Sequence, residues 1–162
     1  MKIYLDSCIL ISYFSKHKEE RKNKKIINKT IKLMEKIEDL EIFISSWGIA
    51  EMMNVMLSRQ KQKNAFVLKC ESMLLGKKRI GNLKLKVLEI GGNNKNYDFG
   101  EFFYDIREII LKYHPGVGDT IHSVIMKNND INHILTFNES DFEDIEGITV
   151  LNPNGVKLIK EK

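Results

Sequence analysis

The hydrophobic and polar positions of this chain fall into short apolar runs separated by longer periodic stretches. The apolar and β-branched runs, which are typical of buried strands, occupy residues 2–5, 41–45, 85–90, 133–137 and 148–151. In the stretches between them, apolar residues recur at a spacing of three or four, which is the period of a helix. We expect helices over residues 8–14, 24–40, 47–63, 64–75, 96–113 and 119–128, and a helical turn over residues 139–144.

The order of these elements predicts the fold class. Strands and helices alternate along the chain, which is typical of an α/β domain whose central, mostly parallel sheet is covered by helices on both faces. Ser46 is expected to cap the helix that begins at Trp47. We expect a single domain over residues 1–153 and a short tail over residues 154–162.

Composition excludes several classes of protein. The 162 residues suffice for one domain, and only 2 prolines and 10 glycines argue against collagen-like or low-complexity architecture. No apolar run approaches the roughly 20 residues that span a bilayer, and Asp6 interrupts the first run too early for a secretory signal. Cys8 and Cys70 lack the spacing of a zinc site or disulfide framework. We therefore expect a soluble cytoplasmic protein without membrane contact.

The net charge of +4 is distributed unevenly. Residues 16–36 hold nine basic side chains against three acidic ones, and residues 59–86 hold nine against one. Clustered Lys and Arg side chains neutralise phosphates and release counterions, so a polyanion such as nucleic acid is a candidate partner. A lysine-rich solvated surface explains the same pattern equally well.

Two carboxylates occupy places where a solvated side chain is not expected. Asp6 directly follows the first apolar run, and burial of a lone carboxylate there costs roughly several kcal/mol unless it is paired or holds a cation. The simpler role for Asp6 is to cap the helix that follows. Glu51 lies one turn into its helix, with Ala50, Met52 and Met53 as neighbours, which is not an ordinary solvated face.

Further polar residues lie at comparable places later in the chain. Asp119 opens an apolar helix, where capping is again the simpler role, and Thr136, Asn138 and Asp141 come at or after the end of the penultimate strand. Ligands of parallel sheets bind beyond the carboxyl ends of the strands, so these residues could converge with Asp6 on one crevice. Divalent cations stabilise clustered carboxylates, and oxygen ligands without histidine or cysteine favour Mg²⁺ or Mn²⁺ over zinc.

Four blocks of sequence share an arrangement that spans nearly the whole chain. They carry a strand ending in an acid, a helical Glu, a third acid at a helix start, and a strand, loop and strand. The blocks are residues 4–11, 44–53, 118–124, and 134–142 with 147–150. In this order they resemble the PIN domain family, which includes the toxins of VapBC-type toxin–antitoxin pairs.

The resemblance implies a three-layer α/β/α fold and a metal-dependent endoribonuclease, in which an activated water hydrolyses RNA phosphodiester bonds. It implies that Asp6, Glu51 and Asp119 hold Mg²⁺ or Mn²⁺, and that Asn138 and Asp141 complete the site. The chain would then process RNA on its own or act as the toxin partner of a small antitoxin. Such nucleases are often homodimers.

Contacts with RNA follow from position and charge. Ser7 and Thr136 lie at strand ends, where their hydroxyls could bind the carboxylates or a phosphate, although backbone capping is an equally good role. Basic side chains of the second cluster are expected to follow the RNA backbone. The candidates are Lys61, Lys63, Lys77, Lys78 and Arg79.

Asn138 departs from the family pattern, which has Asp two residues after the Thr. Asn coordinates through its carbonyl oxygen but brings no charge, so metal affinity would depend more on Asp6 and Asp119. The departure leaves a second function open, that of an inactive PIN module that binds RNA or a protein. His122 receives no catalytic role, because a two-metal site needs no general base; a His packed in the core or at the rim is expected.

Overall fold

The fold is described by a computed structural model that covers residues 1–59, 63–92, 94 and 96–155. Helices and strands alternate as expected, with two short 3₁₀ helices, η1 and η2. The order is β1 (Lys2–Leu5), α1 (Ser7–Phe14), η1 (Lys18–Glu20), α2 (Arg21–Met34), β2 (Glu41–Ser45), α3 (Ser46–Leu57), α4 (Lys63–Leu74), β3 (Arg79–Ile80), β4 (Leu83–Leu88), α5 (Phe99–Tyr113), α6 (Val117–Asn128), β5 (His133–Leu135), η2 (Glu139–Asp141) and β6 (Thr149–Leu151).

The strands form one sheet in the order β3-β4-β2-β1-β5-β6. All neighbours pair in parallel except β3 and β4, so the predicted mostly parallel sheet is confirmed. From β1 the chain moves outward to β2 and β4, and it later returns to the other side of β1 at β5. This reversal is a switch point, where the carboxyl ends of neighbouring parallel strands face a ligand crevice.

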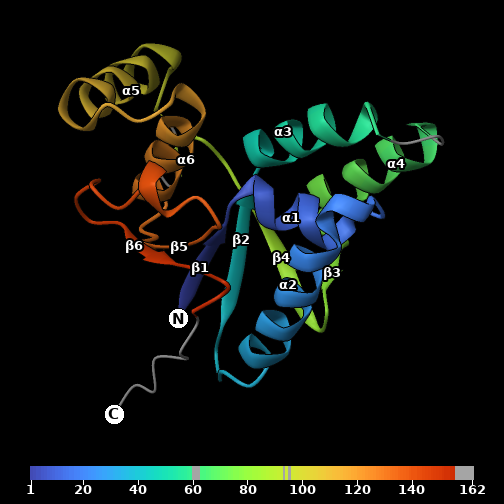
Figure 1. Cartoon of the computed structure of the whole chain (residues 1–162). Helices are drawn as coiled ribbons and strands as arrows, with labels where there is room; N and C mark the ends of the chain where they lie inside the picture. Colours follow the sequence, from blue (N-terminus) through green and yellow to red (C-terminus); the bar gives the residue numbers. More distant parts are fainter. Residues whose placement is uncertain (60–62, 93, 95, 156–162) are drawn as a thin grey trace.

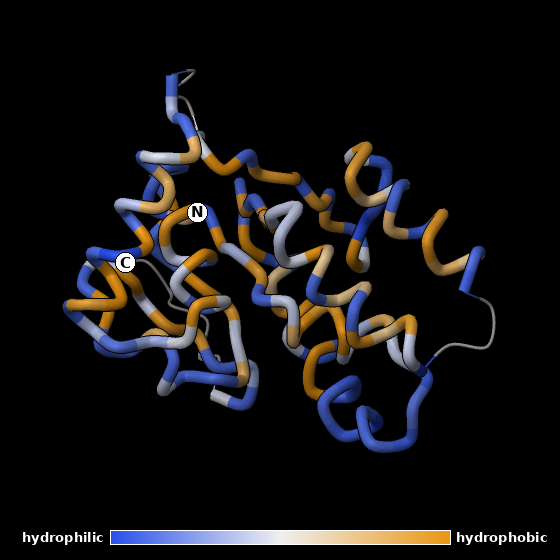
Figure 2. Tube along the Cα trace, turned by 90° about the horizontal axis from the view of Figure 1, so that it is seen from above, coloured by the Kyte–Doolittle hydropathy of each residue, from blue (hydrophilic) through white to orange (hydrophobic). Residues whose placement is uncertain are grey.

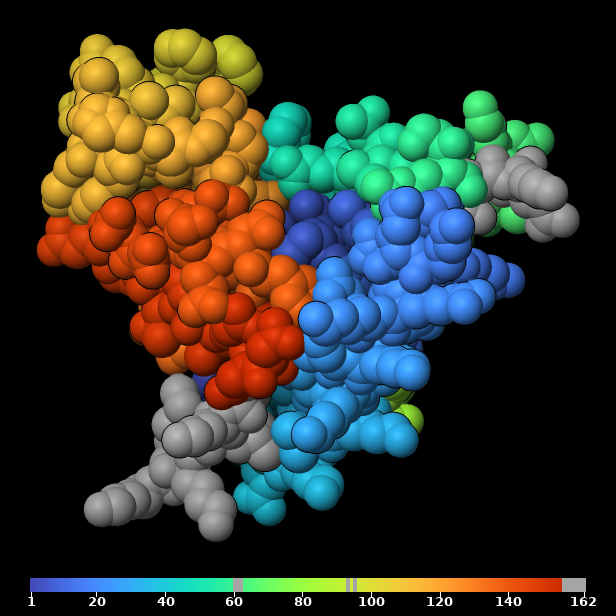
Figure 3. All heavy atoms as spheres, viewed as in Figure 1, coloured from blue at the N-terminus to red at the C-terminus, as the bar shows by residue number. Residues whose placement is uncertain are grey.

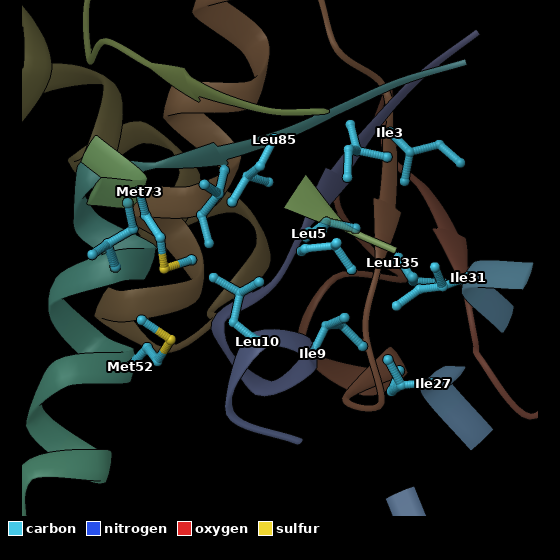
Figure 4. Packing of buried hydrophobic residues seen from close by; sticks show 14 of the residues in the cluster. Ile3, Leu5, Ile9, Leu10, Ile27, Ile31, Met52, Met73, Leu85 and Leu135 are labelled. Carbon is cyan, nitrogen blue, oxygen red and sulfur yellow. The ribbon is translucent and has the colours of Figure 1, made fainter. Parts of the chain in front are cut away.

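Side chains of successive strand residues enter two separate cores. Ile3 and Leu5 of β1 belong to the core that includes residues of α1, α2, α3 and α4, whereas Tyr4 between them belongs to the core that includes residues of α5 and α6. Figure 1 shows α1–α4 on one side of the sheet and α5 and α6 on the other, and Figure 4 shows Ile3, Leu5 and Leu135 meeting α1 and α2 in the first core. The fold is therefore the predicted three-layer α/β/α arrangement.

The helices cover both faces of this sheet. Along the trace, hydrophobic and hydrophilic stretches alternate within the helices (Figure 2). Within the described ranges, none of the helices combines the length and apolar character that a bilayer span requires. Cys8 and Cys70 are both free.

Several predicted boundaries are wrong, each for a local reason. The helix expected to reach residue 40 ends at Met34, and the chain then turns into β2 through Asp39, whose φ of 53° is left-handed. The helix expected over residues 47–63 ends at Leu57. Its cap is Ser45 and not Ser46, because Ser45 Oγ accepts the Gly48 N–H at 3.1 Å. The hairpin strand β3 has only two residues, too few for a periodic pattern.

Candidate active site

Asp6 lies at the end of the central strand β1, where it is 4% exposed. It occupies the N-cap position of α1, yet its side chain makes no capping hydrogen bond, so the capping role is wrong. The carboxylate instead accepts three side-chain hydrogen bonds: Oδ2 from Thr136 Oγ1 at 2.6 Å and Cys8 Sγ at 3.0 Å, and Oδ1 from Ser7 Oγ at 3.2 Å. These donors fix the orientation of a charge that would otherwise be costly to bury.

Thr136 reaches Asp6 because β5 pairs directly with β1. Leu135 lies opposite Leu5 in the sheet, and its carbonyl accepts the Asp6 N–H at 3.1 Å. The Asn138 N–H donates to Thr136 Oγ1 at 2.9 Å, which leaves the hydroxyl hydrogen of Thr136 for Asp6. Thr136 therefore combines both expected contacts: its hydroxyl binds the carboxylate of Asp6 and caps the backbone N–H of Asn138.

Cys8 adds a second donor on the same oxygen of Asp6. Burial first, and then the negative charge of Asp6, raise the pKa of the Cys8 thiol well above its ordinary value. The sulfur therefore stays protonated at neutral pH and donates its hydrogen. This contact has no counterpart among the sequence predictions, because a lone cysteine carries no spacing signal.

Glu51 projects from α3 with its side chain 28% exposed. Its Oε2 lies 2.7 Å from His122 Nε2, and a Cβ on Gly118 would lie 2.9 Å from its Oε1. Both neighbours belong to α6, so Glu51 connects α3 with the beginning of α6. Gly118 allows this approach because it has no side chain at the point of contact.

Asp119 is the third residue of α6, and the N-cap is Gly116, so capping is not the role of Asp119. The carboxylate is half-buried, and among the described residues no side chain or backbone N–H donates to it. Burial first, and then the negative charges of Asp141 and Asp6, raise the pKa of Asp119 to about 6. The cluster thus contains a carboxylate whose charge the protein leaves uncompensated.

Asn138 is the N-cap residue of η2 and Asp141 is its last residue, in the segment that follows β5. Asn138 is exposed, and its backbone is held by Thr136. Asp141 is half-buried and lies near enough to Asp119 to raise its pKa. Of the two, Asp141 therefore adds charge to the cluster.

The described basic candidates lie on α4, on β3 and in the segment between them. Arg79 is on β3, three strands from β1, which is about 14 Å at ordinary strand spacing, and it donates to the carbonyl of Asn82. Lys78 lies near Lys69, whose ammonium sits 3.8 Å over the ring of Phe14. Lys63 begins α4, and Lys77 follows that helix; both are exposed. The predicted Lys61 falls outside the described residues.

His122 lies closer to the carboxylates of the site than the sequence predicts. The expectation of a packed histidine is correct as far as burial goes, since the side chain is 1% exposed. It nevertheless lies 2.7 Å from Glu51 and 3.9 Å from Asp6 Oδ1. Its spacing of three residues from Asp119 places both on one face of α6, which is the signal that could have identified it.

The beginning of the chain, where Asp6 lies, is partly covered by later segments. In the space-filling view the deep-blue beginning of the chain is recessed between the orange C-terminal segment and the green α3–α4 arm (Figure 3). One ligand atom each from Asp6, Glu51 and His122 lie within 4.8 Å of one another. The carboxylate oxygens of Asp6 and Glu51, together with the uncompensated charge of Asp119, fit a divalent cation.

Comparisons with known proteins agree with this geometry. The family model described as PIN domain matches residues 3–148. None of the curated proteins matches the chain.

Among solved structures, the chain is similar to VapBC-1 from nontypeable Haemophilus influenzae, with a TM-score of 0.62 and 15% identity over 95% of this chain and 99% of that chain. It is similar to VapBC2 from Rickettsia felis bound to a DNA fragment from their promoter, with a TM-score of 0.60 and 16% identity over 94% and 98%. For FitAcB from Neisseria gonorrhoeae the values are 0.59 and 13% over 95% and 99%. At these identities the likeness is one of fold.

Proposed function

Because the chain belongs to the PIN domain family, whose members are nucleases, we propose that it is a metal-dependent endoribonuclease that hydrolyses RNA phosphodiester bonds. The observation that carries this proposal is the meeting of Asp6, Glu51 and Asp119 beyond the switch point of the sheet. They come from the end of β1, from α3 and from α6, and the charges of Asp6 and Glu51 both contribute to the raised pKa of Asp119.

In this proposal Asp6, Glu51 and Asp119 hold Mg²⁺ or Mn²⁺, and Asp141 and Asn138 complete the site. When bound, such a cation lowers the pKa of a coordinated water and stabilises charge that develops on the phosphate. The protein contributes the fixed orientation of Asp6, whose carboxylate Thr136 and Ser7 hold by hydrogen bonds.

Substrate binding is assigned to basic side chains on the α4 side of the molecule. The positive charges of Lys78, Lys24 and Lys16 act together on Lys69 and, after burial, lower its pKa. A cluster of mutually repelling ammonium groups is a favourable place for the phosphates of an RNA strand. Lys61, Lys63, Lys77 and Arg79 extend this assignment as predictions from the sequence.

Partners are proposed from the surface and from the fold. The solved structures similar to this chain are toxin–antitoxin complexes in several cases, and we infer that a small antitoxin binds this cytoplasmic protein over the carboxylates of the candidate site. A second copy of the chain is assigned to an apolar groove of about 500 Å³ between α3, α5 and α6. Its exposed large apolar members are Trp47, Ile90, Phe99, Phe103 and Val117. Sedimentation of the Phe103→Lys variant, expected to be monomeric beside a dimeric parent, tests this contact.

Cleavage of end-labelled total RNA and defined oligonucleotides tests the enzymatic proposal. Reactions contain Mg²⁺, Mn²⁺ or EDTA, with the protein free of any inhibitory partner. We expect cleavage that requires the cation and is lost in Asp6→Asn but kept in Asp39→Asn. Asp39 precedes β2, at the amino ends of the parallel strands and away from the carboxyl end of β1, and is a matched control. A folded protein that binds RNA but cleaves none of it with either cation would favour the inactive binding module instead.

A further inference from the structure

A chain of buried hydrogen bonds leads from the β2–α3 junction to Glu51 through His122. Tyr4 Oη lies 2.6 Å from Ser45 Oγ and 2.7 Å from His122 Nδ1. His122 Nε2 lies 2.7 Å from Glu51 Oε2. Ser45 and Tyr4 are 0% exposed and His122 is 1% exposed, so the chain meets solvent at its Glu51 end.

The donor and acceptor of each bond can be assigned from the Ser45 end. Because the Gly48 N–H donates to Ser45 Oγ, the Ser45 hydroxyl keeps its own hydrogen for Tyr4 Oη. Tyr4 then donates to Nδ1 of His122, and the imidazole hydrogen lies on Nε2, which donates to Glu51. If the bonds ran in the opposite direction, Tyr4 Oη and the Gly48 N–H would both donate to Ser45 Oγ. The hydrogen of the Ser45 hydroxyl would then need an acceptor outside this series of hydrogen bonds.

The imidazole ring of His122 packs closely against its neighbours. A Cβ on Gly48 would lie 3.3 Å from His122 Cε1 and 3.1 Å from the side chain of Ile44, which is tighter than most contacts in packed proteins. The ring of Tyr4 meets the imidazole edge-on, with centroids 5.5 Å apart. The ring is therefore held by packing as well as by hydrogen bonds at both nitrogens.

We propose that His122 is a positioning residue for Glu51: its Nε2–H binds Oε2 and thereby turns Oε1 toward the beginning of α6, beside Gly118 and Asp119. The inference rests on the proposed function, since it takes Glu51 as a ligand of the cation. With its hydrogen on Nε2 and that nitrogen bonded to Glu51, His122 acts through the carboxylate and not on water or phosphate.

The experiment measures Mn²⁺ affinity by electron paramagnetic resonance for the parent, His122→Phe and His122→Gln. Loss of such a supporting hydrogen bond typically weakens metal binding about 10–100-fold, so we expect at least about tenfold in His122→Phe. We expect most of the affinity to return in His122→Gln, whose amide can donate to Glu51. His133→Gln, at the amino end of β5, is the matched control and is expected to bind as the parent does.

A double-mutant cycle separates positioning from mere packing. If His122 acts through Glu51, His122→Phe adds no further loss of affinity in the Glu51→Gln background. Additive losses, or direct coupling of a ¹⁴N nucleus to bound Mn²⁺, would overturn the inference. No Mn²⁺ binding by the parent would overturn the proposed function with it, whereas equal binding by parent and His122→Phe would overturn the positioning role alone.

A measurement on the metal-free parent keeps the inference testable if His122→Phe does not fold. Long-range ¹H–¹⁵N correlation spectra distinguish the two tautomers of an imidazole. We expect the hydrogen on Nε2, and a hydrogen on Nδ1 with a bare Nε2 would contradict the assignment.

Discussion

The two aspartates on either side of the crevice hold their charge in different ways. Asp6 is almost fully buried and accepts three side-chain hydrogen bonds, from Thr136, Cys8 and Ser7. Asp119 is half-buried, receives no such donor from the described residues, and faces the charge of Asp141. We call the first group, Asp6 with its donors, the floor of the site, and the second, Asp119 with Asp141, its rim.

The difference shows how one site can hold one carboxylate in a fixed orientation and use another to strengthen the binding of a cation. The floor is preorganised, because hydrogen bonds within the protein replace the water that a buried carboxylate loses. The rim retains electrostatic repulsion between carboxylates that folding does not compensate. A bound cation would relieve this repulsion, which makes cation binding there more favourable. The predictions below change one or both of these groups, and the last changes the surroundings of Glu51.

The largest effects are expected from truncating each aspartate. Asp6→Ala and Asp119→Ala should both lower the rate of RNA cleavage by about 10³-fold or more. Only Asp6→Ala should also destabilise the fold, by about 1–3 kcal/mol, because buried donors of the floor lose their acceptor. Cleavage assays and urea unfolding of the two variants check this. Equal losses of stability would mean that floor and rim do not differ.

A change in Thr136 tests the floor without touching a charge. Thr136→Val should weaken Mn²⁺ binding about tenfold and lower stability by about 1–2 kcal/mol, because both hydrogen bonds of the hydroxyl are lost. Titration of Mn²⁺ and thermal unfolding provide the two readouts. Thr149→Val, at the exposed start of β6, is the control. Unchanged metal affinity in Thr136→Val would show that the floor needs no fixed orientation.

The pH dependence of stability tests the rim. The pKa of Asp119 is raised from 3.8 to about 6, so its folded form binds a proton more tightly than its unfolded form does. The contribution of Asp119 to the free energy of unfolding is therefore full below about pH 4 and lost as the pH rises through 6. Because the side chain is half exposed, this contribution is reduced to about 1 kcal/mol.

Asp119→Asn should remove this pH dependence. In metal-free protein near pH 7.5, the variant should unfold about 3 °C above the parent. Metal binding by the parent should strengthen from pH 5 to 7 as Asp119 loses its proton. Thermal unfolding across pH, with and without Mn²⁺, measures both. A parent whose stability rises with pH over this window would contradict the sign.

The smallest effect is expected at Gly118. A Cβ there would lie 2.9 Å from Glu51 Oε1, so Gly118→Ala should displace that flexible carboxylate and weaken Mn²⁺ binding a few-fold. Stability should not fall, because alanine favours the helix. Metal titration beside thermal unfolding tests this. Weaker binding accompanied by an equal loss of stability would point to general disruption of α6.

The sequence was informative where the signal is local. Asp6 and Glu51 were identified because each is a carboxylate among apolar neighbours, and the α/β class because strand runs alternate with helical periods. The role of Asp6 was not predictable in this way. Whether it caps α1 or accepts from Thr136 depends on a contact across 130 residues.

The same limit applies to the rest of the site. His122 looked like a core residue because the tyrosine and glutamate that bind it lie on other elements. The position of Arg79 on the outer strand follows from the sheet order, which no local pattern encodes. The N-cap of α3 is Ser45 and not the predicted Ser46, because both serines satisfy the same N-cap preference and the sequence does not distinguish them.

The central place of β1 also governs when the molecule becomes competent during synthesis. The first strand made pairs with β5, and Asp6 obtains its shortest hydrogen bond from a residue made 130 positions later. At roughly 5–20 residues per second, a ribosome needs about 6–26 s to cover that distance. During that interval the nascent chain holds its first carboxylate without its main support, so a complete site is expected only late in translation.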